Sequence, residues 1–148
     1  MSRAVKIPYA TTLLVRDSCL CLHVQRAARA LARRFDDVLR PLGLTNGQFS
    51  LMMSLNRPKQ PGMAAVASLL AMDRTTLTAA LKPLERRKLV RVTADPADRR
   101  SRLMTLTPKG RNLLSAAVPI WKRTHHEVEA RLNNGNPSRF RSDLRALS

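Results

Sequence analysis

The apolar residues of this chain recur at intervals of three and four, which is the spacing of amphipathic helices. Turn-forming residues such as Pro41, Gly43 and the Asn133-Asn134-Gly135 run interrupt this spacing. The pattern therefore predicts a series of helices over residues 13–42, 47–55, 63–71, 73–88, 108–132 and 137–147. Residues 1–12 lack the spacing, and we expect them to form a loose arm.

A change of period separates the helix over 73–88 from the helix over 108–132. Leu89, Val90 and Val92 form one short run of strand-forming residues, and residues 103–107 form another. The segment between them, ADPADRRSR, is polar and contains a proline. The two runs thus predict a β-hairpin, and the fold class is mainly α-helical with one small hairpin.

Three residues have the side chains that begin helices. Thr45 is followed three residues later by Gln48, which is the pattern of a capping box. Asp73 directly precedes the helix over 73–88, where its carboxylate can cap the first turn. Pro108 suits the first turn of the next helix, because it has no N–H to leave unsatisfied there.

The helices over 63–71 and 73–88 are separated by only one or two residues, which is the spacing of a helix-turn-helix. Followed by the hairpin, they predict a winged helix-turn-helix. In such a unit the second helix enters the DNA major groove with its N-terminal residues at the base edges. The arginines at the tip of the hairpin would project as a wing, where arginine is suited to a narrow minor groove. We expect Asp98 to hold one of these arginines extended through a charge-assisted hydrogen bond.

The distribution of charge favours double-stranded DNA as the partner. The net charge is +17, and residues 73–111 alone hold eleven basic and four acidic residues. A basic patch on the predicted reading elements is the electrostatic footprint of a nucleic-acid-binding protein. Lys82, Arg86 and Arg87 are weaker phosphate candidates, because exposed basic residues are common on helices. The residues predicted to contact DNA are Arg74, Thr75, Thr76, Thr78, Lys82, Asp98, Arg99, Arg100 and Arg102.

The stretch MDRTTLTAALKPLERRKLVRVTADPADRRSRLMTLTPKG resembles the core of the multiple-antibiotic-resistance regulator (MarR) family, as does the upstream block RPLGLTNGQFSLMMSL. The resemblance implies a homodimeric transcriptional regulator, usually a repressor released by a small ligand. A two-fold dimer would present two recognition helices to DNA, so we expect a palindromic operator. It places Asp98 and Arg100 in the Asp-x-Arg motif of the family wing. Lys88 and Ala71 depart from the pattern, because many relatives have glycine at these two positions.

The resemblance also implies how the chain is organised. We expect a single domain over 1–148, with dimerisation helices in 13–44 and 108–148 and a DNA-binding lobe over 45–107. An effector pocket is implied between the dimerisation helices and that lobe, with Met53 as a further apolar wall. Its candidate residues are Arg16, His23, Gln48, Phe49 and Met52.

Cys21 supports an alternative, a thiol-based peroxide-sensing repressor. It lies 24 residues before Thr45, a spacing that resembles the organic-hydroperoxide branch of the family, although Gln25 and Phe35 stand where that branch has tyrosines. A reactive thiolate needs neighbours that lower its pKa. A buried structural cysteine is the simpler interpretation.

Other classes of function are disfavoured. The chain has no GxSxG, phosphate-binding loop or dinucleotide fingerprint, so we expect no enzyme and no cofactor. His125-His126-Glu127 does not have zinc-ligand spacing, so no metal is expected. No apolar run reaches the length of a membrane span. Cys19 and Cys21 are two residues apart and cannot form a disulfide within one helix, so the sequence predicts a reduced, cytoplasmic chain. A non-specific architectural DNA-binding protein remains a second alternative, because every segment is basic.

Overall fold

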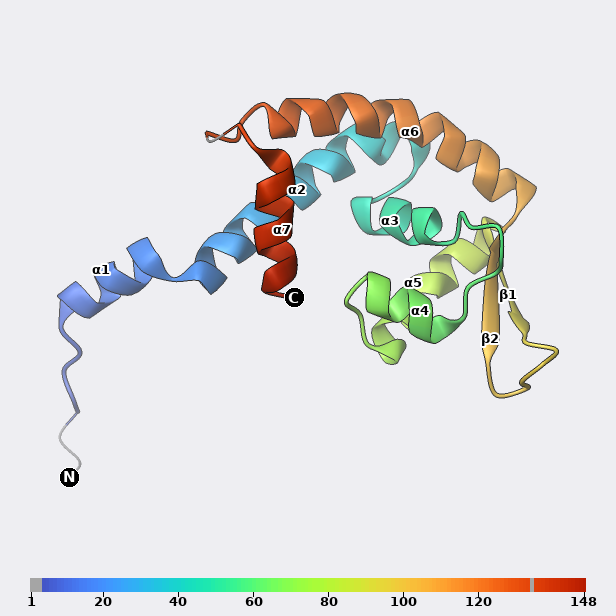
Figure 1. Ribbon diagram of the computed structural model, residues 1–148, viewed down its shortest axis with the longest axis horizontal. Coiled ribbons are helices and arrows are strands. Elements are labelled where there is room, and N and C mark those ends of the chain that lie inside the picture. The colour runs from blue at the N-terminus through green and yellow to red at the C-terminus, as the bar shows by residue number, and fades with distance from the viewer. Residues whose placement is uncertain (1–3, 134) are drawn as a thin grey trace. The chain divides into compact units, whose positions relative to one another are not determined.

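The structure is a computed structural model that describes residues 4–133 and 135–148 (Figure 1). It confirms the predicted fold class, mainly α-helical with one antiparallel hairpin. No helix among these residues is long and apolar enough to cross a membrane. The elements are α1 (Tyr9–Ser18), α2 (Leu20–Leu39), the 3₁₀ helix η1 (Arg40–Leu42), α3 (Asn46–Ser54), α4 (Met63–Leu69), α5 (Arg74–Arg86), β1 (Val90–Ala94), β2 (Arg102–Leu106), α6 (Pro108–Glu129) and α7 (Pro137–Ala146).

The chain forms two compact units, one ending at Arg34 and the other beginning at Phe35. In the first unit the prediction of one helix over 13–42 is wrong, because the helix is interrupted at Cys19. The loose arm predicted over 1–12 is wrong over 9–12, which are helical; residues 4–8 are irregular, and residues 1–3 lie outside the described part of the chain. A helix starts at Tyr9 after Pro8 and stops at Ser18, whose hydroxyl donates to the carbonyl of Leu14 at 2.5 Å. Cys19 has an extended backbone, and its Sγ accepts the N–H of Leu22 at 3.5 Å. The apolar spacing continues across this break and does not reveal it. The break depends instead on a single residue, Cys19, whose side chain caps the new helix.

The predicted helix caps of the second unit are confirmed. The hydroxyl of Thr45 accepts the N–H of Gln48 at 3.2 Å, and the Gln48 side chain accepts the N–H of Thr45 at 3.1 Å. The carboxylate of Asp73 accepts the N–H of Thr76 at 2.7 Å. Pro108 lies in the first turn of α6. Each of these helices therefore begins where its first free N–H groups find an acceptor or, at Pro108, where one of them is missing.

One apolar core holds α3, α4, α5, the hairpin and α6 together. Leu39, Met52, Val66, Leu77 and Met104 are all inaccessible to solvent, and each comes from a different element. In α5 the buried residues recur at 77, 81 and 84, so one side of that helix is packed and the other is left exposed. The core thereby fixes which face of α5 is open to solvent.

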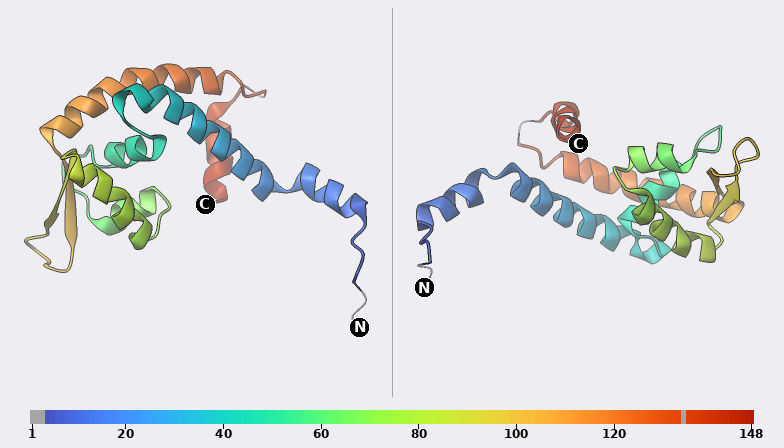
Figure 2. Two further views of the ribbon diagram at one scale, coloured as in Figure 1. Left: turned by 180° about the vertical axis from the view of Figure 1, so that it is seen from behind. Right: turned by 90° about the horizontal axis from the view of Figure 1, so that it is seen from below.

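The hairpin pairs in antiparallel register, from Val90 opposite Leu106 to Ala94 opposite Arg102. The segment before α4 adds a short third partner that the sequence did not predict. Gly62 forms a bridge with Leu103, and the N–H of Met104 donates to the carbonyl of Pro61 at 3.2 Å. Strand β2 is thus hydrogen-bonded on both of its edges, to β1 and to the segment before α4. The tip of the hairpin extends beyond the helices (Figure 2).

Ala71 and Lys88 have left-handed backbones, with φ of 51° and 58°. The resemblance to the MarR family implies glycine at these two positions in many relatives, and the backbone conformation gives a physical reason for it. A residue with a Cβ in this conformation costs roughly 1–2 kcal/mol, whereas glycine adopts it freely. Both residues closely follow the ends of α4 and α5, where the chain must reverse.

Replacing Lys88 by glycine is expected to raise the free energy of unfolding by roughly 0.5–1 kcal/mol, because the relieved strain exceeds the added entropy of the unfolded chain. The Lys88 side chain is exposed, so little packing is lost. Urea unfolding measures the change. Lys88→Ala is the matched control, since alanine keeps the strained φ, and equal stabilities for the two variants would contradict this account.

Candidate DNA interface

Helices α4 and α5 pack against each other through their apolar faces and leave the opposite face of α5 to solvent. Val66 and Ala67 of α4 and Leu77 and Leu81 of α5 are buried in the shared core. The turn between the helices contains Ala71, whose N–H donates to the carbonyl of Ser68 at 3.2 Å. This geometry is that of a helix-turn-helix, with α5 in the position of the recognition helix.

The first turn of α5 presents polar side chains on its exposed face. Arg74, Thr75 and Thr76 are all exposed, and Lys82 follows further along the helix. The hydroxyl of Thr78 donates to the carbonyl of Arg74 at 2.8 Å, which leaves its oxygen as an acceptor and its methyl group for contact. The positive end of the helix dipole adds attraction for phosphate.

The tip of the hairpin is ordered by two aspartates, not by arginine–aspartate pairs. The carboxylate of Asp95 accepts the N–H of Ala97 at 2.9 Å, and the carboxylate of Asp98 accepts the N–H of Arg100 at 3.0 Å. The prediction that Asp98 holds an arginine side chain is therefore wrong. Within the described part of the chain its carboxylate forms no ion pair, and it acts on the backbone, as aspartate does in tight turns.

The arginines of the wing have their guanidinium groups exposed. None of Arg99, Arg100 and Arg102 has a side-chain hydrogen bond or ion pair with another described residue. Because the hairpin tip projects beyond the helices (Figure 2), these groups can reach a DNA backbone or groove. The backbone of the tip is thus ordered, and the positive charge of its arginines is not paired with any described residue.

Two further basic side chains near α5 are engaged in holding the lobe together. The guanidinium of Arg87 donates to the carbonyl of Gly43 at 2.6 Å, and the ammonium group of Lys109 donates to the carbonyl of Arg87 at 3.1 Å. Arg87 therefore ties the end of α5 to the turn before α3. Sequence alone could not separate it from Arg86, its neighbour in the same basic run.

Two capping carboxylates have lowered pKa values. The pKa of Asp73 lies below its ordinary value mainly because the N–H of Thr76 donates to it. The pKa of Asp36 is lowered first by the backbone N–H of Asn46, at 2.7 Å, and then by the Asn46 side chain, at 2.8 Å. Asp36 joins the end of α2 to the start of α3 within the second unit.

We expect these two groups to make the lobe sensitive to acid. A lowered folded pKa gives stability that is present above the unfolded value, about 3.9 for aspartate, and is lost as the pH falls through the folded value. The free energy of unfolding should therefore decline below about pH 4. Urea unfolding between neutral and acidic pH tests this, with the double variant Asp36→Asn/Asp73→Asn expected to decline less steeply. Identical pH profiles for the two proteins would contradict the assignment.

An apolar cavity of about 470 Å³ lies among α3, α4 and α6. Phe49 and Met53 line it, and the ring of Trp121 stacks against Phe49 with centroids 6.1 Å apart. Other candidates for the effector pocket lie elsewhere, since Met52 is fully buried in the core and Gln48 is used in its capping box. The remaining residues that line the cavity are Ser50, Ser54, Leu69, Val118 and Lys122.

The other sequence candidates lie in the first unit. Arg16 forms an ion pair with Asp17 at 2.6 Å, which raises the pKa of the arginine and lowers that of the aspartate. The Nδ1 atom of His23 is 2.8 Å from the carbonyl oxygen of Cys19. Cys21 is exposed, and its Sγ accepts a hydrogen bond from the Gln25 side chain at 3.1 Å.

A helix-turn-helix with an exposed polar recognition helix and a basic wing defines a DNA-binding protein. Comparison with known proteins identifies the family of DNA-binding proteins to which the chain belongs. The MarR family model matches residues 44–101, and the chain is 35% identical over 106 residues to the transcriptional regulator HosA of Escherichia coli O111:H-, a match covering 70% of this chain and 77% of HosA. This chain belongs to the MarR family of transcriptional regulators.

Solved structures agree with this assignment. The transcriptional regulator MosR of M. tuberculosis, in complex with DNA, is 41% identical with a TM-score of 0.80, over 88% of this chain and 93% of MosR. The transcriptional repressor CouR, bound to a 23-mer DNA duplex, is 28% identical with a TM-score of 0.78, over 90% of this chain and 94% of CouR. The protein is therefore a DNA-binding transcriptional regulator.

Proposed function

We propose that this protein is a repressor that reads a palindromic DNA site as a homodimer and is released by a small ligand. The proposal rests on one observation: the chain has both an exposed Arg74-Thr75-Thr76 face on α5 and wing arginines whose side chains are not paired with any described residue. Arginine can read guanine through two hydrogen bonds, and threonine can contact a base edge or a thymine methyl. The repressor role is supported by NicR of Pseudomonas putida, a transcriptional repressor 30% identical over 92 residues.

Selection of bound DNA from a random pool tests the reading function. We expect an inverted repeat whose half-sites are about one helical turn apart, bound at least about 10³-fold more tightly than random DNA. An undivided half-site would reject the dimeric reader. Recovery of no preferred sequence would favour the alternative of a non-specific architectural protein.

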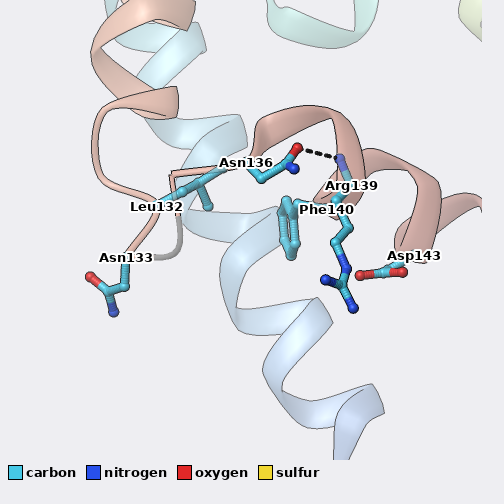
Figure 3. Close-up of a pocket in the computed structure, with 6 residues that line it drawn as sticks. All are labelled: Leu132, Asn133, Asn136, Arg139, Phe140 and Asp143. Atoms are coloured by element: carbon cyan, nitrogen blue, oxygen red, sulfur yellow. Dashed lines mark hydrogen bonds between the residues drawn. The ribbon is translucent and has the colours of Figure 1, made fainter.

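Self-association is supported by apolar side chains that the single chain leaves in solvent. Near the C-terminus, Phe140 of α7 is 45% exposed and Leu147 is 64% exposed. A hollow of about 630 Å³ is lined by Phe140 together with Leu132, Arg139 and Asp143. Figure 3 shows these side chains. Such exposed apolar groups mark an interaction surface, and a two-fold dimer buries the same patch twice. Sedimentation equilibrium should give twice the chain mass of 16.6 kDa, and a monomer would exclude the dimer.

The apolar cavity is the proposed effector site, walled by Phe49, Met53 and Trp121 with Lys122 among its lining residues. This combination suits a small planar molecule with one anionic group, which could stack on the rings and pair with the ammonium group. A relative 29% identical, BpsR of Bordetella bronchiseptica, has its DNA binding regulated by 6-hydroxynicotinic acid.

Trp121 is the only tryptophan, so its fluorescence reports on the cavity directly. Titration with 6-hydroxynicotinic acid and related aromatic acids should change that fluorescence and lower the affinity for the selected DNA. Lys122→Gln should weaken the response to acids but not the affinity for DNA. Release of DNA without any change at Trp121 would place the effector elsewhere.

A further inference from the structure

Three arginines form one exposed face of α2, far along the chain from the helix-turn-helix. Arg26, Arg29 and Arg33 are separated by three and four residues, so they lie on the same side of the helix. All three are exposed, and they span about 10 Å of helix length at roughly 1.5 Å per residue. We refer to them as the arginine face.

The charge of this face is not neutralised within its own unit. The only acidic residue before residue 35 is Asp17, and it is paired with Arg16. Asp36 and Asp37 follow Arg33 on the same helix, but Asp36 accepts the N–H of Asn46 and Asp37 pairs with Arg40. Arg29 donates to the neutral side chain of Gln25 at 3.1 Å, while Arg26 and Arg33 have no side-chain partner among the described residues. Like charges three and four residues apart destabilise a helix by about 0.2–0.5 kcal/mol per pair, so an anionic partner would relieve a standing repulsion.

The kind of side chain favours DNA phosphates over a membrane surface. Between positions 20 and 40 arginine occurs without any lysine, and its planar guanidinium binds a phosphate through two parallel hydrogen bonds. Membrane-surface helices place tryptophan, phenylalanine and leucine opposite their basic face. Opposite the arginine face, the first unit has Leu20, Val24, Ala28 and Leu31, which include two leucines but no aromatic anchor. Phe35, the next residue along this side of α2, is half-buried. Duplex DNA is also the polyanion that a regulator of this family meets.

We propose that the arginine face is a second DNA-binding surface, which contacts phosphates without reading sequence. It acts in addition to the recognition helix and wing, and it would hold either the flank of the same duplex or a second duplex. The proposal requires only that the chain encounters DNA, so it does not depend on repression, on an effector or on the palindrome.

The test compares the full chain with the triple variant Arg26→Gln/Arg29→Gln/Arg33→Gln. Glutamine has nearly the helix propensity of arginine, so α2 should be preserved. The matched control is Arg123→Gln/Arg131→Gln/Arg145→Gln, which removes the same charge from exposed positions in and after α6 and in α7. Fluorescence anisotropy over a salt series gives the slope of log K against log salt on random-sequence duplex. Circular dichroism verifies the helix content of each variant.

Loss of the arginine face should flatten this slope by about 2–3 units per bound chain, since each phosphate contact contributes about 0.9. Two further arms distinguish the source of the phosphates. If the flank of one duplex is held, the triple variant loses affinity only when the selected site has long random flanks. If a second duplex is held, the native chain bound to its site on beads should capture labelled free DNA, and the triple variant should not.

Equal slopes and equal capture for the triple variant and the control would overturn the proposal. So would binding to phosphatidylglycerol vesicles that depends on the arginine face while the DNA slope is unchanged. Because the slope is measured on random DNA, the result stands even if selection finds no preferred site. The two proposals can therefore fail independently.

Discussion

Replacing Gly110 by alanine is expected to destabilise the DNA-binding lobe by about 3 kcal/mol or more, at or beyond the upper end of the roughly 1–3 kcal/mol that overpacking usually costs. A Cβ at Gly110 would lie 2.1 Å from the carbonyl oxygen of Leu89 and 3.0 Å from its carbonyl carbon. Both are backbone atoms, so no rotation of a side chain can make room. The start of α6 would have to move away from the start of β1.

Such a movement would break a compact set of hydrogen bonds. The hydroxyl of Thr107 donates to the carbonyl of Lys88 at 2.7 Å and accepts the N–H of Gly110 at 3.0 Å. The N–H of Thr107 donates to the carbonyl of Leu89 at 3.1 Å. The end of α5, the first strand and the beginning of α6 meet at this one residue, so separating them would disturb the position of the recognition helix.

Urea unfolding measures the loss, and Gly47→Ala is the matched control. Gly47 lies in α3, is exposed, and has no atom closer to an added Cβ than the Thr45 hydroxyl at 4.0 Å. Alanine there should stabilise the protein by roughly 0.5–1 kcal/mol through helix propensity. If both variants change stability alike, the close approach of Gly110 to Leu89 is not a determinant of the fold.

The sequence predicts those parts of the lobe that depend on local rules. The capping side chains of Thr45 and Asp73 act on N–H groups three residues away, so their patterns are visible in the chain itself. The hairpin follows from two apolar runs separated by a polar segment. Local rules also place Thr75 and Thr76 on the exposed side of α5, because Leu77 and Leu81 fix the buried side.

Contacts between distant segments could not be predicted in the same way. Nothing in the spacing of Gly110 indicates that it lies against Leu89, and nothing in the basic run after α5 singles out Arg87 as the partner of Gly43. The pairing of Pro61 with Met104 likewise joins segments whose sequences predict a turn and a strand independently.

Competition between neighbouring groups accounts for the predictions that are wrong. Asp98 is adjacent to arginine side chains in sequence, but its carboxylate instead accepts the backbone N–H of Arg100. At Cys19 a single extended residue ends one helix and caps the next, although the apolar period continues. Binary patterns describe faces, and they are insensitive to such single-residue choices.

Replacing Arg100 by alanine is expected to weaken binding to the selected DNA by roughly tenfold or more per half-site, as a contact worth about 1–3 kcal/mol would. The side chain is exposed at the tip of an ordered turn, and none of the described residues competes for its charge. If it contacts phosphate, the salt slope should also fall by about one unit per half-site. Anisotropy titrations over a range of salt concentrations measure both quantities.

Variants of Asp98 then separate the wing as a contact surface from the wing as a folded turn. An asparagine side chain at this position would keep an acceptor for the N–H of Arg100, so Asp98→Asn should bind DNA about as well as the native chain. Asp98→Ala removes that acceptor, and the loosened tip should lose part of the affinity that Arg100→Ala loses. Arg123→Ala, which removes the same charge from an exposed position in α6, should leave binding nearly unchanged. If Arg123→Ala and Arg100→Ala weaken binding equally, the protein responds to net charge alone, and the wing has no particular place in the complex.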